Sequence, residues 1–271
     1  PFAGSLPEAD FALRLAPSRH DLLTRHYPRT VALLESLVPL LLTQHTEVPT
    51  GSLTRLIPAF NAFVETLPPG KIPAALRPQL LDLFQLEKTK LAFVQLHRKS
   101  SLETYLAGLH HQDQMSSALN RPSAWLLDQT LSISKSVKVI RSQWEWSNED
   151  AHEQSGQKAT RYAAVPPGNF EYIVQVSGKL ETAEFFLTRD KQLLFHCFDH
   201  PKTVRQAVAE IQHTIRSLPP GMLQELIFGL SKSRDTTDFL NHLNSIILYR
   251  IREWLYRGIL VMVKSQGQII V

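Results

Sequence analysis

The clearest alternation of apolar and polar positions begins at Phe170. Every second residue from Phe170 to Val176 is apolar, which predicts a strand with one inward face. Ser177-Gly178 predicts a turn, and Glu181 to Leu187 forms a second run. The polar residues Arg189 to Lys191 separate it from a third run, Leu193 to Phe198. Because the breaks between these runs are short, the pattern predicts antiparallel hairpins.

Helical spacing replaces this alternation after Pro201. Apolar residues recur every three or four positions from Lys202 to Arg216, where Thr203 is positioned to cap a helix. Met222 to Ser231 predicts a second, short helix. Asp238 to Gly258 predicts a third helix, with Asp238 as its N-cap and Gly258 as its stop.

The third helix is amphipathic, and a hairpin is expected after it. At about 100° per residue, one face carries the apolar residues Leu240, Leu243, Ile247, Ile251, Trp254 and Leu255. The opposite face carries His242, Ser245, Tyr249, Arg252 and Tyr256. Ile259 to Val263 and Gln268 to Val271 predict a closing hairpin.

The first part of the chain has helical periodicity. We expect helices over Tyr27–Gln44, Leu53–Leu67, Arg77–Arg98 and Leu102–Leu109, with Pro39 kinking or ending the first. Ser136 to Trp146 has the composition of a strand. The predicted fold class is α+β, with an N-terminal helical bundle followed by a winged-helix-like domain of three antiparallel strands, three helices and a closing hairpin. The expected boundaries are 1–125 for the helical domain, 126–168 for a connecting segment with one possible strand, and 169–271 for the last domain.

Composition narrows the class of protein. The chain has 271 residues, 43% of them hydrophobic and 20% charged, which is ordinary for a globular protein. The net charge of +4 is spread evenly, whereas nucleic-acid binders usually concentrate basic charge. Cys197 is the only cysteine, so no internal disulfide is possible. The single cysteine favours a cytoplasmic protein, and because no apolar run has membrane-spanning length, we expect no membrane span.

Two clusters contain residue types that ligate metals. In His196-Cys197-x-Asp199-His200, neighbouring side chains of a strand would point to opposite faces, so a buried strand end is the simpler interpretation. His110-His111-x-Asp113 has no second cluster nearby in sequence and fits a solvated helix end. Nucleophile-elbow and phosphate-loop motifs are also missing from the sequence. We therefore expect neither a catalytic residue nor a metal site in this chain.

Two surfaces remain as candidate binding sites. Tyr249 and Tyr256 align on the last helix with Arg252 between them, a combination that suits a peptide or a nucleic-acid strand. A solvated helix face is the alternative. The second surface is the edge of the expected third strand, where a guest peptide could pair with the backbone unless another segment covers it. Its contact residues would be Gln192, Leu194, His196 and Phe198.

Several segments resemble a known family. The expected strands and helices, with LYRIREWLYRGIL at Leu248–Leu260, resemble the winged-helix peptide-recognition domains that are similar to the PqqD peptide chaperone. HYPRTVALLESLVPLLL, IPAFNAFVE and LRPQLLDLFQLEKTKLAF look like the helical half of HvfC-type proteins, and LDQTLSISKSVKVIRSQWEW looks like their middle segment. Relatives of that family include TglI and MbnC, and the TglI-like type is favoured. Where the family usually has Tyr-Arg at the start of its second helix, this chain has Tyr27-Pro28-Arg29.

The resemblance implies a function. Such proteins are partner subunits of barrel-type, multinuclear non-haem iron oxygenases, which modify ribosomally made peptides. It implies a heterodimer in which this chain binds the precursor's leader, the helical domain docks the oxygenase, and the iron belongs to the partner subunit. In a TglI-like pathway the partner would oxidatively remove the β-carbon of a C-terminal cysteine. The alternatives are a winged-helix DNA-binding protein and a metalloenzyme using the groups around His196.

Overall fold

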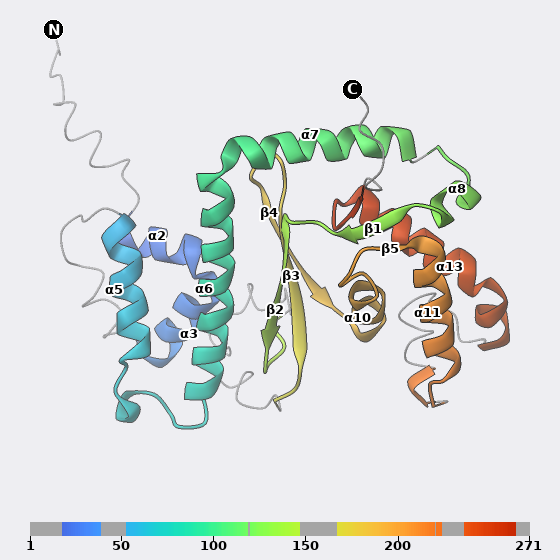
Figure 1. Ribbon diagram of the computed structural model, residues 1–271. Helices are drawn as coiled ribbons and strands as arrows, with labels where there is room; N and C mark the ends of the chain where they lie inside the picture. The colour runs from blue at the N-terminus through green and yellow to red at the C-terminus, as the bar shows by residue number, and fades with distance from the viewer. Residues whose placement is uncertain are drawn as a thin grey trace, which may run out of the picture. The chain divides into compact units, whose positions relative to one another are not determined.

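The computed structural model describes residues 18–38, 53–118, 120–146, 167–219, 221–223 and 236–263. The chain forms two compact units: the first comprises 1–91 and 142–170, and the second comprises 92–141 and 171–271. Helices dominate the first unit, and the second combines helices with small sheets, which confirms the α+β class (Figure 1). Among the described helices, none is long and apolar enough to cross a membrane.

The first unit packs its helices around three aromatic rings. It contains α2 (Arg19–His26), α3 (Pro28–Leu37), α5 (Leu53–Glu65), the short 3-10 helix η1 (Pro69–Lys71) and most of α6 (Arg77–Lys99). The buried ring of Tyr27 lies 5.0 Å from Phe60 and 5.8 Å from Phe84, and its hydroxyl donates to Asn61. The helices expected at Leu53–Leu67 and Arg77–Arg98 are confirmed, and α3 ends before Pro39 as expected.

Two carboxylates tie the helices of this unit together. Buried Glu87 accepts hydrogen bonds from the backbone N–H groups of Arg29 and Thr30, both at 3.0 Å, and it pairs with the Arg29 guanidinium. These N–H groups begin α3 and have no partner within it, so Glu87 caps the helix from α6. Asp82 accepts from the Ser142 hydroxyl, the Gln143 N–H and the Trp146 indole, and so holds the segment 142–146 on α6.

The second unit has two three-stranded sheets. One contains β1 (Thr130–Ile133), β5 (Lys202–Thr203) and β6 (Leu260–Met262) in the order β5-β1-β6, with antiparallel pairing. The other contains β2 (Val137–Ser142), β3 (Phe170–Val176) and β4 (Thr182–Leu187) in the order β2-β3-β4. The predicted strands at Ser136–Trp146, Phe170–Val176 and Glu181–Leu187 are confirmed. β1 was not expected, and both strands of the supposed connecting segment pair with strands of the C-terminal part.

The β3–β4 hairpin contacts a helix through its turn. Ser177 N–H donates to the Glu181 carbonyl at 2.8 Å, and Leu180 takes a left-handed conformation with φ of 62°. The turn lies against α7 (Ser101–Ala118), where the Gly108 and Gly178 backbones meet so closely that a Cβ at Gly108 would be 2.7 Å from the Gly178 Cα (Figure 1). This helix extends well beyond the expected Leu102–Leu109.

The described part of the second unit also contains α8 (Ser123–Leu127), α10 (Arg189–His196), α11 (Val204–Arg216) and α13 (Thr236–Tyr256). Thr203 caps α11 as predicted, through a capping box with Gln206. α13 begins two residues before Asp238, so Asp238 is not its N-cap. Gly258, with φ of 72°, lies just beyond its end, as expected of a stop. Residues 224–231 of the expected short helix and Gln268–Val271 of the closing hairpin lie outside the described residues.

The prediction of a third strand at Leu193–Phe198 is wrong. These residues belong to α10 and the turn after it. The consecutive apolar residues Leu193, Leu194 and Phe195 fit a buried strand or a helix equally well, and the structure decides for the helix. Leu194 and Phe198, four residues apart, enter the core together. β3 instead gains its second neighbour from β2, which precedes it in the sequence.

Candidate functional site

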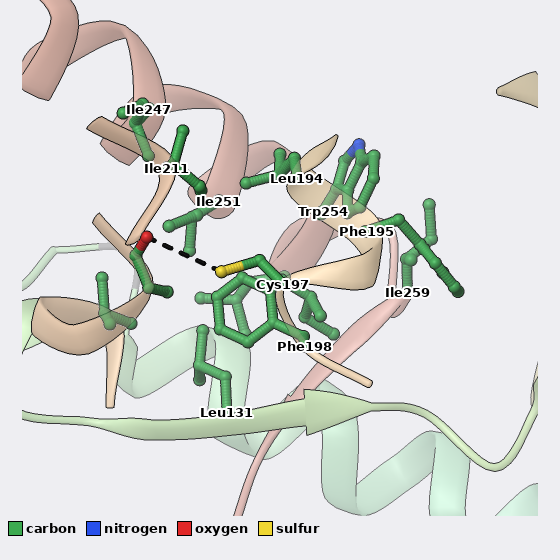
Figure 2. Close-up of a cluster of buried hydrophobic side chains, with 14 of the residues drawn as sticks. Leu131, Leu194, Phe195, Cys197, Phe198, Ile211, Ile247, Ile251, Trp254 and Ile259 are labelled. Atoms are coloured by element: carbon green, nitrogen blue, oxygen red, sulfur yellow. Dashed lines mark hydrogen bonds between the residues drawn. The ribbon is translucent and has the colours of Figure 1, made fainter. Parts of the chain in front are cut away.

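The outer face of α13 carries the candidate site in the second unit. The inner face is fixed by Leu243, Ile247, Ile251, Trp254 and Leu255, all buried in the core (Figure 2). The predicted apolar stripe is therefore confirmed at those positions, and the side chain of Leu240 lies outside the described residues. On the opposite face Tyr249 and Tyr256 are 66% and 67% exposed, two helical turns apart. A well-packed helix thus presents two aromatic rings to solvent.

Arginines surround these rings. The Arg250 guanidinium lies 6.0 Å from the centre of the Tyr249 ring and donates to a Glu253 oxygen at 2.9 Å. Arg257 pairs with the other Glu253 oxygen at 2.8 Å, and its guanidinium lies 5.4 Å from the ring of Phe185 on β4. One carboxylate, that of Glu253, therefore pairs with both guanidinium groups.

Arg252, predicted as the cation between the tyrosines, is held at one end. Its Nη2 donates to the backbone carbonyl of Arg121 at 2.9 Å, which links α13 to the segment before α8. The side chain is only partly exposed. The structure thus brings Tyr249, Arg252 and Tyr256 onto one helix face, as predicted. The neighbouring Arg250, Glu253 and Arg257 were not singled out, although their spacing of three and four residues is a sequence signal for ion pairs on a helix.

The other predicted contact residues do not form a strand edge. Gln192, Leu194 and His196 lie on α10, and Phe198 follows it. A helix uses its backbone N–H and C=O groups internally, so a guest strand has no ladder to extend here. Leu194 and Phe198 are moreover buried in the core (Figure 2). Docking of a peptide strand along Gln192–Phe198 is therefore excluded by the fold of this segment.

His196 instead belongs to an ion-pair cluster. Its Nε2 lies 2.6 Å from a Glu171 oxygen, and its Nδ1 lies 3.2 Å from an Asp199 oxygen. Arg141 donates to the second Glu171 oxygen at 3.1 Å. Burial alone would lower the pKa of His196, but the hydrogen bonds that its ring donates to Glu171 and Asp199, together with the charges of those carboxylates, outweigh burial, so the pKa is raised. The cluster ties α10 to strands β2 and β3.

Cys197 is a core residue. Its thiol points at the Ala207 carbonyl of α11, with Sγ 3.6 Å from the oxygen, among Phe198, Ile211 and Ile251 (Figure 2). Burial raises the pKa of this thiol to about 12, and the nearby Glu210 acts in the same direction. A thiol with so high a pKa is a poor nucleophile and a poor metal ligand at neutral pH. In the part of the chain that the structure describes, no three His, Cys, Asp or Glu side chains are placed to hold a metal.

His111 of α7 is partly buried at the C-terminal end of α13. Its Nε2 is 3.2 Å from the Cβ position of Gly258, and neither ring nitrogen makes a hydrogen bond of normal geometry with another described residue. Burial lowers the pKa of His111, while the backbone of Tyr256 and Leu255 acts in the opposite direction. His110 is exposed on the same helix, so the two histidines do not converge on one site.

Comparison with known proteins adds no relative: no protein-family model, no curated protein and no solved structure matches this chain. The resemblance to HvfC-type and PqqD-like proteins therefore stays a prediction from the sequence pattern.

Proposed function

We propose that this chain is a non-catalytic subunit that binds the leader of a ribosomally made precursor peptide and presents it to an iron-dependent, multinuclear oxygenase. The observation that carries the proposal is the outer face of α13, a well-packed helix with two exposed tyrosines and with Arg250, Arg252 and Arg257 beside them. The element order α10–β5–α11–α13–β6 is compatible with a winged-helix-like domain, in which α13 would be the recognition helix.

The chemistry of this face selects an acidic, partly apolar peptide. Tyrosine gives a large contact area for little lost conformational freedom, and tyrosine and arginine are enriched where binding energy concentrates. Arginine binds carboxylates with two parallel hydrogen bonds. A leader segment that places apolar side chains against Tyr249 and Tyr256, and carboxylates near Arg250 and Arg252, would match the face. The proposed contact is therefore a helix face and not a strand edge.

A binding subunit of this kind would help the reaction by tethering. Affinity held in the leader leaves the reacting end of the peptide free to vary. Once the leader is bound, the reacting end meets the partner's iron at an effective concentration set by the tether, which reaches about millimolar for short flexible linkers. The N-terminal helices would dock the oxygenase, and in a TglI-like pathway the partner would remove a cysteine β-carbon from the peptide.

The test is a titration of the purified chain with precursor peptides encoded beside its gene. Tyr249→Ala and Arg252→Glu are each expected to weaken binding about tenfold or more, because hot-spot truncations cost about 2 kcal/mol. Ser245→Ala, an exposed position on the same face one turn from Tyr249, is the matched control and should bind like wild type. If Tyr249→Ala and Arg252→Glu both bound the peptide with unchanged affinity, α13 would not be the binding surface.

Duplex DNA serves as the competing ligand. The rival function, a winged-helix DNA-binding protein, requires affinity that falls steeply with salt, because phosphate contacts dominate it. We expect only weak binding of random duplex, since the net charge of the chain is +4. Tight, salt-sensitive DNA binding that is lost in Arg252→Glu would favour the rival function.

A further inference from the structure

The long helix α7 exposes several large apolar side chains to solvent. Leu102, Tyr105, Leu106 and Leu109 are 69%, 51%, 53% and 45% exposed. Spacings of three and four residues place them in one line along the helix, called here the α7 stripe. Four large apolar side chains in a line form a patch of the size that on monomers often marks an interaction site, about 300–600 Å².

The buried face of α7 shows why the stripe lies on the exposed face. There α7 places Thr104, Gly108 and Met115 against the rest of the second unit. Gly108 meets the backbone of Gly178 in the β3–β4 turn, and a side chain at either position would collide with the other. Small residues are therefore required inside, and the apolar residues of this half of the helix do not contribute to the core. Their presence calls for a partner outside the unit.

We propose that the α7 stripe is a self-association surface, which binds the α7 stripe of a second copy of this chain in an antiparallel arrangement. A two-fold axis between Tyr105 and Leu106 would pair each α7 residue with a residue of the second copy, and the two residue numbers of each pair add up to 211. Leu102 then faces Leu109, and Tyr105 faces Leu106. Every large apolar residue meets another one, as an isologous interface requires.

The charges at the two ends of the stripe select the antiparallel direction and the second copy. Arg98 and Lys99 precede the stripe in the last turn of α6, and exposed Asp113 follows it. The antiparallel arrangement brings the Asp113 end of the stripe of one copy to the junction of α6 and α7 of the other copy, where Arg98 and Lys99 lie. Glu103, near the basic end, offsets only part of that charge. A parallel arrangement would bring like charges together at both ends, at a cost.

The size of the surface sets the expected strength. A standard stable interface buries about 800 Å² per partner, and the α7 stripe offers less. The dimer should therefore be weak and depend on concentration. It is independent of the peptide site on α13, so the two proposals can fail separately.

Sedimentation of the full chain, from low to high micromolar concentration, tests the inference. The mass should rise from 30.8 kDa toward twice that value. Leu106→Glu should weaken the dimer by at least about 30-fold, because it buries a carboxylate among leucines. Met222→Glu, at an exposed apolar residue outside the stripe, is the matched control and should dimerise like wild type. Circular dichroism establishes that each variant is folded.

Charge exchange provides a second readout that is insensitive to folding defects. Asp113→Arg removes two symmetry-related ion pairs and should weaken the dimer by about two- to thirtyfold, since each exposed pair contributes about 0.2–1 kcal/mol. Adding Arg98→Asp should restore it. A wild-type chain that stays monomeric throughout, or a dimer indifferent to Leu106→Glu, would overturn the proposal. The proposal would also be overturned if Leu106→Glu abolished binding of the iron subunit and left the dimer unchanged.

Discussion

α7 and α13 are the two longest helices of the second unit, and they divide their residues in opposite ways. α13 turns its large apolar residues into the core and presents tyrosines and arginines outside. α7 turns small residues inward to admit the β3–β4 turn and leaves leucines outside. Amphipathicity alone therefore predicts the buried face of α13 and would mispredict that of α7. The difference separates the polar face proposed to bind a peptide from the apolar face proposed to bind a second copy.

The largest effect should come from removing equal side chains from the two helices. Leu255→Ala in α13, where the side chain is 2% exposed, is expected to lower the free energy of unfolding by about 2–5 kcal/mol. Leu106→Ala in the α7 stripe should change it by no more than about 0.5 kcal/mol in dilute solution. Urea denaturation compares the two, and similar losses would mean that the stripe is part of the core.

A glycine substitution tests the close approach of α7 to the turn. Alanine normally stabilises a helix interior relative to glycine by about 0.5–1 kcal/mol. At Gly108 the sign should reverse to a loss of about 1–3 kcal/mol, because the new Cβ would lie 2.7 Å from the Gly178 backbone. Gly70→Ala, with no atom within 4 Å of the added Cβ, is the control. A more stable Gly108→Ala protein would contradict the account.

The contact between the two helices should also respond to pH. The pKa of His111 is lowered from its usual 6.5 in the folded chain, so the unfolded chain takes up a proton first as pH falls. Stability is then full above the unfolded pKa and declines below it, by at most about 1.4 kcal/mol per pH unit. His111→Gln should flatten that decline. Denaturation at several pH values measures it, and an unaltered pH profile would show that protonation of His111 is not coupled to folding.

His196 should give the opposite and smallest response. Its pKa is raised in the folded chain by Glu171 and Asp199, so its stabilisation is full below the unfolded pKa and is lost as pH rises through the folded value. The side chain is about one third exposed, and solvent screening keeps the effect under about 1 kcal/mol. His196→Gln should therefore lose stability at pH 5 to 6 and little at pH 8, as denaturation series can measure.

The local pattern of apolar and polar residues predicted much of the fold. The stripe of α13, the Thr203 cap of α11 and the β3–β4 hairpin all follow from spacing within a few residues, and each is confirmed. The wrong prediction of a strand at α10 arose because three consecutive apolar residues have neither helical nor strand periodicity. β1 was missed because its partners are distant: Leu131 pairs with Lys202 and with Met262.

Site residues divide in the same way. Tyr249, Arg252 and Tyr256 share a face because helical geometry alone aligns them. The exposure of the α7 stripe depends on Gly178, some seventy residues further along the chain than Gly108, and no local pattern could show that contact. What the pattern left open was decided by contacts between segments distant in sequence.

A photo-crosslinking amino acid at one tyrosine of each helix tests the account most directly. Tyr249 and Tyr105 are both more than half exposed and differ in the surface they occupy. With a bound precursor peptide, position 249 should capture the peptide, and position 105 should capture a second copy of the chain. Capture of the peptide from position 105, or none from position 249 at saturating peptide, would contradict the assignment of α13 as the recognition helix.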